Sequence, residues 1–238
     1  SAITWDPDNK TFVKTKPTEL KGRVMPKVIS MSDACGTLNS IKLIDYNMSV
    51  VNSEKAVRVT AEDIQLDEAL GHFIGMMIGD GWVSRQGEFS SHSMICFANV
   101  TKELVDSFKS QIHRLIPDYD MNNIRKDCSK HMFQGYDCYS EKYTVTNTSL
   151  AGNIDNWICA KAANKRLPEF FLSAPREFRE GLLAGLIDTD GTMNWSKACC
   201  KKNPQFSVAY STVSINLAHE IVLLAKSFGI KASITESV

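Results

Sequence analysis

Two related segments constrain the fold of this chain more than any other feature of its sequence. Residues 183–191 read LAGLIDTDG and residues 73–81 read FIGMMIGDG, and each segment places an aspartate before a glycine, at Asp80 and Asp190. The two copies align with an offset of 190 − 80 = 110 residues. An internal repeat of this kind predicts two copies of one structural unit within a single chain.

Both segments are apolar around most of a helix circumference, which is typical of helices that are buried on most sides. We therefore expect buried helices over 67–80 and 175–189. Small residues recur in each segment at a spacing of four, where they line one helix face and allow another backbone to approach closely. The predicted contact between the two helices consists of Gly75, Gly79, Gly185 and Thr189.

The glycines that follow the two aspartates, Gly81 and Gly191, are expected to end these helices in a left-handed conformation. Asp80 and Asp190 then lie in the last turn, where the helix dipole disfavours a carboxylate by a few tenths to about 1 kcal/mol, so a positive group should compensate. If the helices pack side by side, the two carboxylates meet and repel each other unless a divalent cation bridges them. Oxygen ligands favour Mg²⁺ or Ca²⁺ over zinc. The alternative is that both are only helix-ending Asp-Gly turns.

With these two motifs the chain resembles the LAGLIDADG homing endonucleases in their single-chain, two-motif form. The second motif differs from the family name at Thr189, and the first has Ile78 at the position of the first aspartate but keeps the second, Asp80. The resemblance implies that Asp80 and Asp190 are the catalytic, metal-holding residues. Asp188 matches the non-catalytic aspartate of the second motif.

The same resemblance implies further parts of the site. The backbone of Gly79 and Thr189 would contribute to the metal site, with Mg²⁺ as the cofactor and Mn²⁺ or Ca²⁺ as substitutes. Lys165, in the stretch NKRLPEFF ahead of the second motif, matches a lysine that the family uses near the active site. The alternative for Lys165 is a lysine that contacts a phosphate or only solvent.

The order of periodic segments predicts an α+β fold of two pseudo-symmetric αββαββα units. Helices expected over 101–116 and 213–228 follow strand pairs in each copy, and a strand is expected at the C-terminal KASITES. The halves span 67–174 and 175–238, and the second reads as truncated. The two curved sheets would form a saddle for duplex DNA with the motif helices packed at its centre, in a monomer with internal pseudo-two-fold symmetry.

Residues 1–66 lack the repeat and read as a small, mostly β segment, with strands expected near 11–14, 23–30 and 57–60. The stretch FVKTKPTELKGRVMPKV resembles an interior segment of inteins, and this extension is a possible DNA contact. The whole chain is most like the endonuclease region of an intein. A free-standing or intron-encoded enzyme is the alternative.

Strand residues on the open face of the saddle are expected to read base edges, because a β-ribbon fits the major groove. The alternative for each is a solvated strand face. The candidate DNA contacts are Arg85, Gln86, Arg125, Lys126, Lys142, Asn194, Lys197 and Gln205.

Composition fits this interpretation only in part. The net charge of zero argues mildly against nucleic acid, although basic residues cluster locally within 10–27 and 161–166. No apolar run is long enough to span a membrane, and seven cysteines without regular spacing favour a reduced, intracellular and cytoplasmic protein. Zinc at Cys128, His131 and Cys138 is disfavoured because a second ligand pair is lacking.

The sequence therefore favours a metal-dependent, site-specific double-strand DNA endonuclease that acts in homing of an intein or intron. The alternative is a DNA- or RNA-binding module on the same scaffold, such as a maturase or a regulator, that has lost the nuclease activity.

Overall fold

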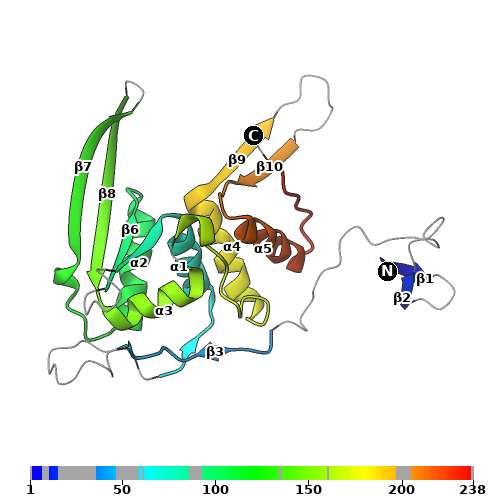
Figure 1. Cartoon of the computed structure of the whole chain (residues 1–238), viewed down its shortest axis with the longest axis horizontal. Coiled ribbons are helices and arrows are strands. Elements are labelled where there is room, and N and C mark those ends of the chain that lie inside the picture. The colour runs from blue at the N-terminus through cyan, green and yellow to red at the C-terminus, as the bar shows by residue number, and fades with distance from the viewer. Residues whose placement is uncertain are drawn as a thin grey trace.

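Figure 1 shows the computed structural model of the chain. The structure describes residues 2–6, 11–15, 36–46, 59–60, 62–85, 93–133, 136–159, 161–196 and 205–236. Two helices from distant parts of the sequence, α1 (Glu68–Gly79) and α4 (Arg176–Asp190), pack against each other at its centre. Their ends agree with the helices predicted over 67–80 and 175–189.

Small residues make this close helix contact possible. A Cβ atom added at Gly75 would lie within 3 Å of backbone atoms of Leu182 and Leu186, and one added at Gly185 would lie as close to the backbone of His72. Gly79 faces the Thr189 side chain in the same way. The series continues one helix turn earlier, where added Cβ atoms would meet the facing backbone at two positions that the sequence analysis missed, Gly71 and Gly181.

The first half has the predicted αββαββα order, with its motif helix α1 as the first element. Its antiparallel sheet runs β5-β6-β8-β7, and helices α2 and α3 follow the two strand pairs. The bounds are β5 (Gly81–Arg85), β6 (Ser93–Ala98), α2 (Lys102–Leu115), β7 (Arg125–Phe133), β8 (Tyr136–Thr146) and α3 (Thr148–Ile158), with 3₁₀ turns at Met121–Asn123 and Ala162–Asn164.

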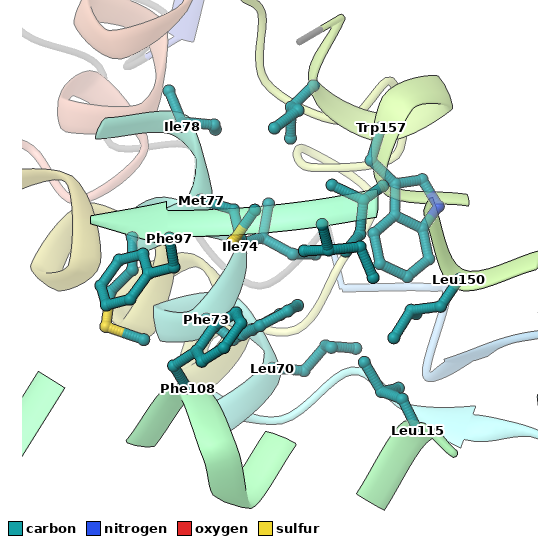
Figure 2. Close-up of a cluster of buried hydrophobic side chains, with 14 of the residues drawn as sticks. Leu70, Phe73, Ile74, Met77, Ile78, Phe97, Phe108, Leu115, Leu150 and Trp157 are labelled. Carbon is teal, nitrogen blue, oxygen red and sulfur yellow. The ribbon is translucent and has the colours of Figure 1, made fainter. Parts of the chain in front are cut away.

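The core of this half lies between α1, the sheet and the two helices (Figure 2). Phe108 of α2 stacks on Phe97 of β6 with ring centroids 5.0 Å apart and on Phe73 of α1 at 6.1 Å. On the α3 side, Leu150 and Trp157 join the same cluster. From Leu70 to Ile78, helix α1 is thus buried on most sides, as its apolar circumference predicts.

The second half contains β9 (Gly191–Ser196), β10 (Gln205–Tyr210) and α5 (Ile215–Ser227). In Figure 1 the β9–β10 hairpin and the β7–β8 hairpin project as two arms on either side of α1 and α4. The strand expected at KASITES is wrong, because residues 231–236 have no strand structure and pair with no other strand among the described residues. The mixed helix and sheet architecture confirms the α+β fold class.

The N-terminal segment contributes two short strand pairs. Strand β1 (Ala2–Asp6) pairs with β2 (Thr11–Thr15), and β3 (Ser40–Ile41) pairs with β4 (Ile64–Gln65). The strand predicted at 23–30 lies outside the described residues, and no strand is found at 59–60. Among the described residues, no helix combines the length and the apolarity that crossing a membrane requires.

The prediction that Gly81 and Gly191 adopt a left-handed conformation is wrong. Gly191 has φ −78° and ψ 146°, and Gly229 is the glycine with positive φ in the described part of the chain. Both motif helices pass directly into a strand, so the residue after the aspartate is extended. Glycine is required there for another reason, since an added Cβ would lie within 3 Å of Met77 or Ile187 in the preceding helix turn.

The start of α1 depends on Asp67. Its carboxylate accepts a hydrogen bond from the Leu70 amide at 2.9 Å and pairs with the Arg114 guanidinium at 2.9 Å. Burial works to raise the pKa of Asp67, but the hydrogen bonds from Arg114 and Leu70 outweigh it and hold the pKa below its ordinary value of 3.8.

Replacing Asp67 by alanine is expected to lower the free energy of unfolding by about 1–2 kcal/mol, because a helix cap and an ion pair are lost together. A lowered folded-state pKa stabilises the protein above pH 3.8, and this stabilisation disappears as pH falls through the folded pKa. Urea unfolding at pH 7 and pH 3 measures both effects. Asp67→Asn, which keeps a cap acceptor but not the charge, should lose only part of the stability, and an equal loss at both pH values would contradict the role of the charge.

Candidate active site

The two motif aspartates lie at the same end of the packed helices. Asp80 is the C-cap of α1, where its amide donates to the Met76 carbonyl, and Asp190 is the last residue of α4. Strands β5 and β9 begin at the next residue in each case. The local order of helix, aspartate and strand thus places one carboxylate from each half where its motif helix passes into the first strand of that half.

Asp80 is held by a neighbour that the sequence analysis missed. The Asn99 side-chain amide donates to Asp80 Oδ2 at 2.7 Å. Burial raises the pKa of Asp80 above its ordinary value, and the negative charge of Asp190 raises it further, while the hydrogen bond from Asn99 opposes both. The expected repulsion between the two carboxylates is therefore present, but burial is the larger cause of the raised pKa.

Asp190 is more exposed than Asp80 and has a different partner. The Tyr210 hydroxyl, from the end of β10, donates to Asp190 Oδ2 at 3.4 Å. Burial raises the pKa of Tyr210, and the charges of Asp190 and Asp80 raise it further, so the phenol stays neutral beside the two carboxylates. The two aspartates therefore have unlike surroundings despite the internal repeat.

Lys165 is the positive group expected near the helix ends. Its ammonium donates to the carbonyls of Gly79 at 3.0 Å and Gly81 at 3.1 Å, and also to that of Ile78. Burial lowers the pKa of Lys165, whereas the charges of Asp190 and Asp80 raise it. The ammonium thus lies at the negative end of α1 within the electrostatic reach of both carboxylates.

Lys165→Met is expected to raise the pKa of Asp80 further, because the lysine charge lowers that pKa in the native protein. The variant also leaves three backbone carbonyls without their donor, which should cost about 1–3 kcal/mol of stability. A ¹³C NMR titration of the Asp80 carboxyl in EDTA, together with urea unfolding, measures these effects. Exposed Lys161→Met is the control, and an unchanged Asp80 pKa in Lys165→Met would contradict the coupling.

The donors available to a metal ion here are oxygens. Among the residues that the structure describes, no group of three or more His, Cys, Asp and Glu side chains is placed to hold an ion. The Gly79 carbonyl already accepts from Lys165. The Thr189 hydroxyl donates within α4 to the Gly185 carbonyl at 2.9 Å. Two carboxylates that repel each other nevertheless fit a hard divalent cation.

Asp188, which matches the non-catalytic motif aspartate, lies apart from this site. Its Oδ2 is 2.9 Å from His72 Nε2 on α1, so it links the two motif helices. The Ser107 hydroxyl lies 3.5 Å from the other ring nitrogen of His72.

The outer face of the four-stranded sheet forms a groove that contains two of the predicted DNA contacts, Arg125 and Lys142. Both cations bind Asp127, with Arg125 Nε at 2.8 Å and Lys142 Nζ at 3.2 Å. The groove is thus polar and carries one more positive than negative charge. Its lining consists of Trp82, Ser84, Met94, Cys96, Asn123, Arg125, Asp127, Lys142, Thr144 and Thr146.

Lys126 does not share this face. It pairs in register with Tyr143, whereas Arg125 pairs with Thr144, so the two neighbours project to opposite sides of the sheet. Lys126 Nζ binds Glu141 at 2.7 Å and lies over the Tyr143 ring. The expectation that both neighbours lie on one face is therefore wrong, because successive strand residues alternate, and a DNA contact by either residue stays a prediction.

The structure describes only some of the other predicted DNA contacts. Asn194 is exposed on β9. Arg85 ends β5 and Gln205 begins β10, but their side chains are outside the description. Gln86 and Lys197 lie outside the described residues altogether.

A family model of known proteins matches part of this chain. Residues 177–237, which include most of α4 and all of β9, β10 and α5, match the LAGLIDADG-like domain family. The family resemblance inferred from the motifs is thereby confirmed.

Sequence relatives match over most of this chain but over a small part of their own length. The DNA-directed RNA polymerase subunit Rpo1C of Methanocaldococcus jannaschii is 26% identical over 200 residues, which are 79% of this chain and 21% of that protein. The ATP-dependent DNA helicase Hel308 of Thermococcus kodakarensis is 26% identical over 184 residues, 77% of this chain and 15% of that protein. The chain thus spans about a fifth or less of these relatives.

Similar solved structures include the homing endonuclease I-WcaI bound to its DNA recognition sequence, with 15% identity and a TM-score of 0.38. That likeness covers 58% of this chain and 57% of the other. I-DmoI in complex with DNA and Mn has 12% identity and a TM-score of 0.35, with 57% and 72% of the two chains covered.

Proposed function

We propose that this LAGLIDADG chain is a site-specific endonuclease that hydrolyses phosphodiester bonds in both strands of duplex DNA with a divalent metal ion, preferably Mg²⁺. One observation carries the proposal: Asp80 and Asp190, from two halves of the chain, lie at the same end of two packed helices and interact electrostatically. Two structural turns would have no need to place their carboxylates together, because that placement opposes folding.

Asp80 and Asp190 are the residues that would hold the metal. Mg²⁺ usually keeps several waters and takes one or two carboxylates plus phosphate oxygens of the substrate, which suits a site with two aspartates. When bound, the ion would lower the pKa of a water molecule and neutralise charge on the scissile phosphate. The backbone oxygens of Gly79 and Thr189 stay proposed contributors, although Gly79 also accepts from Lys165.

The surrounding side chains have separate tasks in this proposal. Asn99 fixes the orientation of the Asp80 carboxylate through its 2.7 Å hydrogen bond. Lys165 holds a positive charge beside both carboxylates, where it can contact a phosphate oxygen or donate a proton in the transition state. Tyr210 would help to orient the Asp190 carboxylate through its hydrogen bond.

The groove of the first half would hold DNA. Arg125 and Lys142 lie in it together, and Asn194 is exposed on the opposite arm. A phosphate or guanine base could replace Asp127 as the partner of the two cations, which makes binding sensitive to salt. Lys126 is not part of this proposed DNA surface, because it lies on the opposite face of the sheet.

The family relatives support the homing context. A polymerase subunit and a helicase have different activities, yet both contain one segment of about 180–200 residues that matches this chain. A shared segment that makes up so little of two unlike proteins is the pattern of an insertion. We therefore propose that this chain acts in homing of an intein or intron, with residues 1–66 as an intein-like extension before halves that begin at 67 and 175. A cytoplasmic location stays a prediction from the cysteines.

The proposal is tested by incubating the protein with Mg²⁺ and a library of long random duplexes, followed by sequencing of the cleaved ends. We expect double-strand breaks at one sequence, and none in EDTA. Specific binding to a duplex without cleavage in Mg²⁺ or Mn²⁺ would instead favour the binding module, whether maturase or regulator.

A further inference from the structure

The linker between α3 and α4 carries Lys165 to the active site, and helix α5 of the second half holds this linker, residues 159–175. The Ser214 hydroxyl donates to the Lys165 carbonyl at 2.7 Å. Two residues further along the linker, the Leu167 amide donates to Glu220 Oε2, also at 2.7 Å. The backbone around Lys165 is therefore tied to α5 at two points.

Both α5 side chains leave solvent to make these contacts. Ser214 is 1% exposed, and it also caps α5, since its hydroxyl accepts from the Leu217 amide at 3.3 Å. Glu220 is half-buried, and burial raises its pKa, while the Leu167 amide and the charge of Arg166 oppose this shift. Because moving a carboxylate out of water costs free energy, its contact with one backbone amide is a specific tether of the linker.

A lysine ammonium needs a fixed backbone if it is to stay in one place. The four-carbon stem of lysine is flexible, and burial lowers the pKa of Lys165 because the charged form loses solvent. The ammonium is nevertheless held on the carbonyls at the end of α1, among them those of Gly79 and Gly81. If the linker moved away from α5, the stem would turn and the ammonium would return to water.

We propose that Ser214 and Glu220 are positioning residues of the active site, which fix the linker backbone and thereby hold the Lys165 ammonium beside the two motif carboxylates. This role rests on the proposed function, in which Lys165 acts on the phosphate. The second half thus places a cation that lies at the end of the first motif helix. The end of β10 contributes to the same site, since Tyr210, four residues before Ser214, reaches Asp190.

Reductive methylation of lysines, read by mass spectrometry on the DNA-free protein, tests the position of the ammonium without the use of cleavage. Lys165 should react several-fold faster in Glu220→Leu, which removes the acceptor, than in the native protein. Glu220→Gln keeps an acceptor and should leave Lys165 at the native rate. Exposed Lys161 in the same linker is the internal reference. The matched control is Glu169→Gln, because exposed Glu169 pairs with the side chain of Arg166 and not with the linker backbone.

Cleavage kinetics give a second measurement. In Glu220→Leu the catalytic rate should fall about 10-fold, the lower end of the loss expected when a supporting residue is removed, while binding of the duplex in EDTA stays native. In a Lys165→Met background the same change should not reduce the residual cleavage further, because the ammonium that it positions is already absent. Ser214→Ala should act in the same direction as Glu220→Leu. Thr212→Val, which removes a hydrogen bond at the start of the same helix, is its control.

Thermal melts establish that each variant is folded before it is measured. A native labelling rate of Lys165 in both Glu220→Leu and Ser214→Ala would overturn the positioning role. Equal losses of cleavage in Glu220→Leu and Glu220→Gln would overturn it as well, since the acceptor would then be irrelevant. Faster labelling of Lys165 in Glu220→Leu, in a native protein that cleaves no duplex, would support the placement of Lys165 by α5 and count against the proposed function.

Discussion

Gly185→Leu is expected to unfold most of the protein at room temperature or to lower its free energy of unfolding by at least about 3 kcal/mol. The reason is the distance between the motif helices. A Cβ at position 185 would lie within 3 Å of the His72 carbonyl and of the Met76 amide on α1, and both are backbone atoms that cannot rotate away. Even alanine should therefore destabilise, although alanine in place of a mid-helix glycine ordinarily stabilises by about 0.5–1 kcal/mol.

Urea unfolding followed by circular dichroism measures this effect. Ala184→Leu is the control, since Ala184 precedes the glycine on the same helix and is only half-buried. Its free energy of unfolding should change by less than about 1 kcal/mol, the usual range for substitutions away from a tight contact. Wild-type stability of Gly185→Leu would show that the helices do not approach each other as the structure places them.

Asp190→Asn is expected to reduce cleavage of the target duplex at least about 100-fold, which is the upper end of what is lost when a residue that only supports a metal ligand is removed. Binding of the duplex in EDTA should persist, because the groove residues are unchanged. Asp188→Asn is the matched control two residues earlier on the same helix; its partner is His72, and its cleavage rate should stay within about threefold of the native rate.

Asp190→Asn should be at least as stable as the native protein in EDTA. Burial and the charge of Asp190 raise the pKa of Asp80 in the folded state, so the folded protein binds a proton there more tightly than the unfolded chain. This tighter proton binding favours folding at pH values below 3.8, the ordinary pKa, and its stabilisation is lost as pH rises through the folded-state pKa. Removing the Asp190 charge therefore stabilises at pH 7 and has little effect at pH 3.

Thermal melts at the two pH values, with and without Mg²⁺, separate these effects. Because the described residues bring only two carboxylates together here, Mg²⁺ should shift the melting temperature of the DNA-free protein little. A large shift with Mg²⁺ alone, or a large loss of stability in Asp190→Asn, would mean that these aspartates are structural and that the active site lies elsewhere.

Much of the architecture could be predicted because its causes are local in sequence. The apolar circumference of 67–80 dictates burial of that helix on most sides. The same expectation for 175–189 is wrong, because α4 is buried along the face of Phe178, Leu182 and Leu186 while Leu183, Ala184 and Ile187 are only half-buried. Small residues four positions apart dictate where one helix approaches the other. The offset of the repeat then pairs Asp80 with Asp190. These features follow from helix periodicity alone, so the packing of the two motif helices could be predicted from the sequence.

Other features depend on contacts between distant segments. Nothing in the sequence marks Asn99 as the partner of Asp80, except that it follows β6, whose register returns the chain to the start of β5. Tyr210 reaches Asp190 for the same reason in the second half. The side of the sheet that Lys126 faces depends on where β7 begins, and a shift of one residue reverses it.

The sequence by itself determined the two motif helices, their small-residue faces and the two aspartates at their ends, since all three follow from which residues share one side of a helix. Tertiary structure decided what surrounds those aspartates: a buried Asp80 held by Asn99, a more exposed Asp190 beside Tyr210, and Lys165 on the carbonyls at the end of α1. It also decided that β6 lies between two paired strands, β5 and β8, whereas β10 pairs with β9 alone among the described residues. These differences arise from strand register and from the packing of α3, which a repeat read along one chain does not contain.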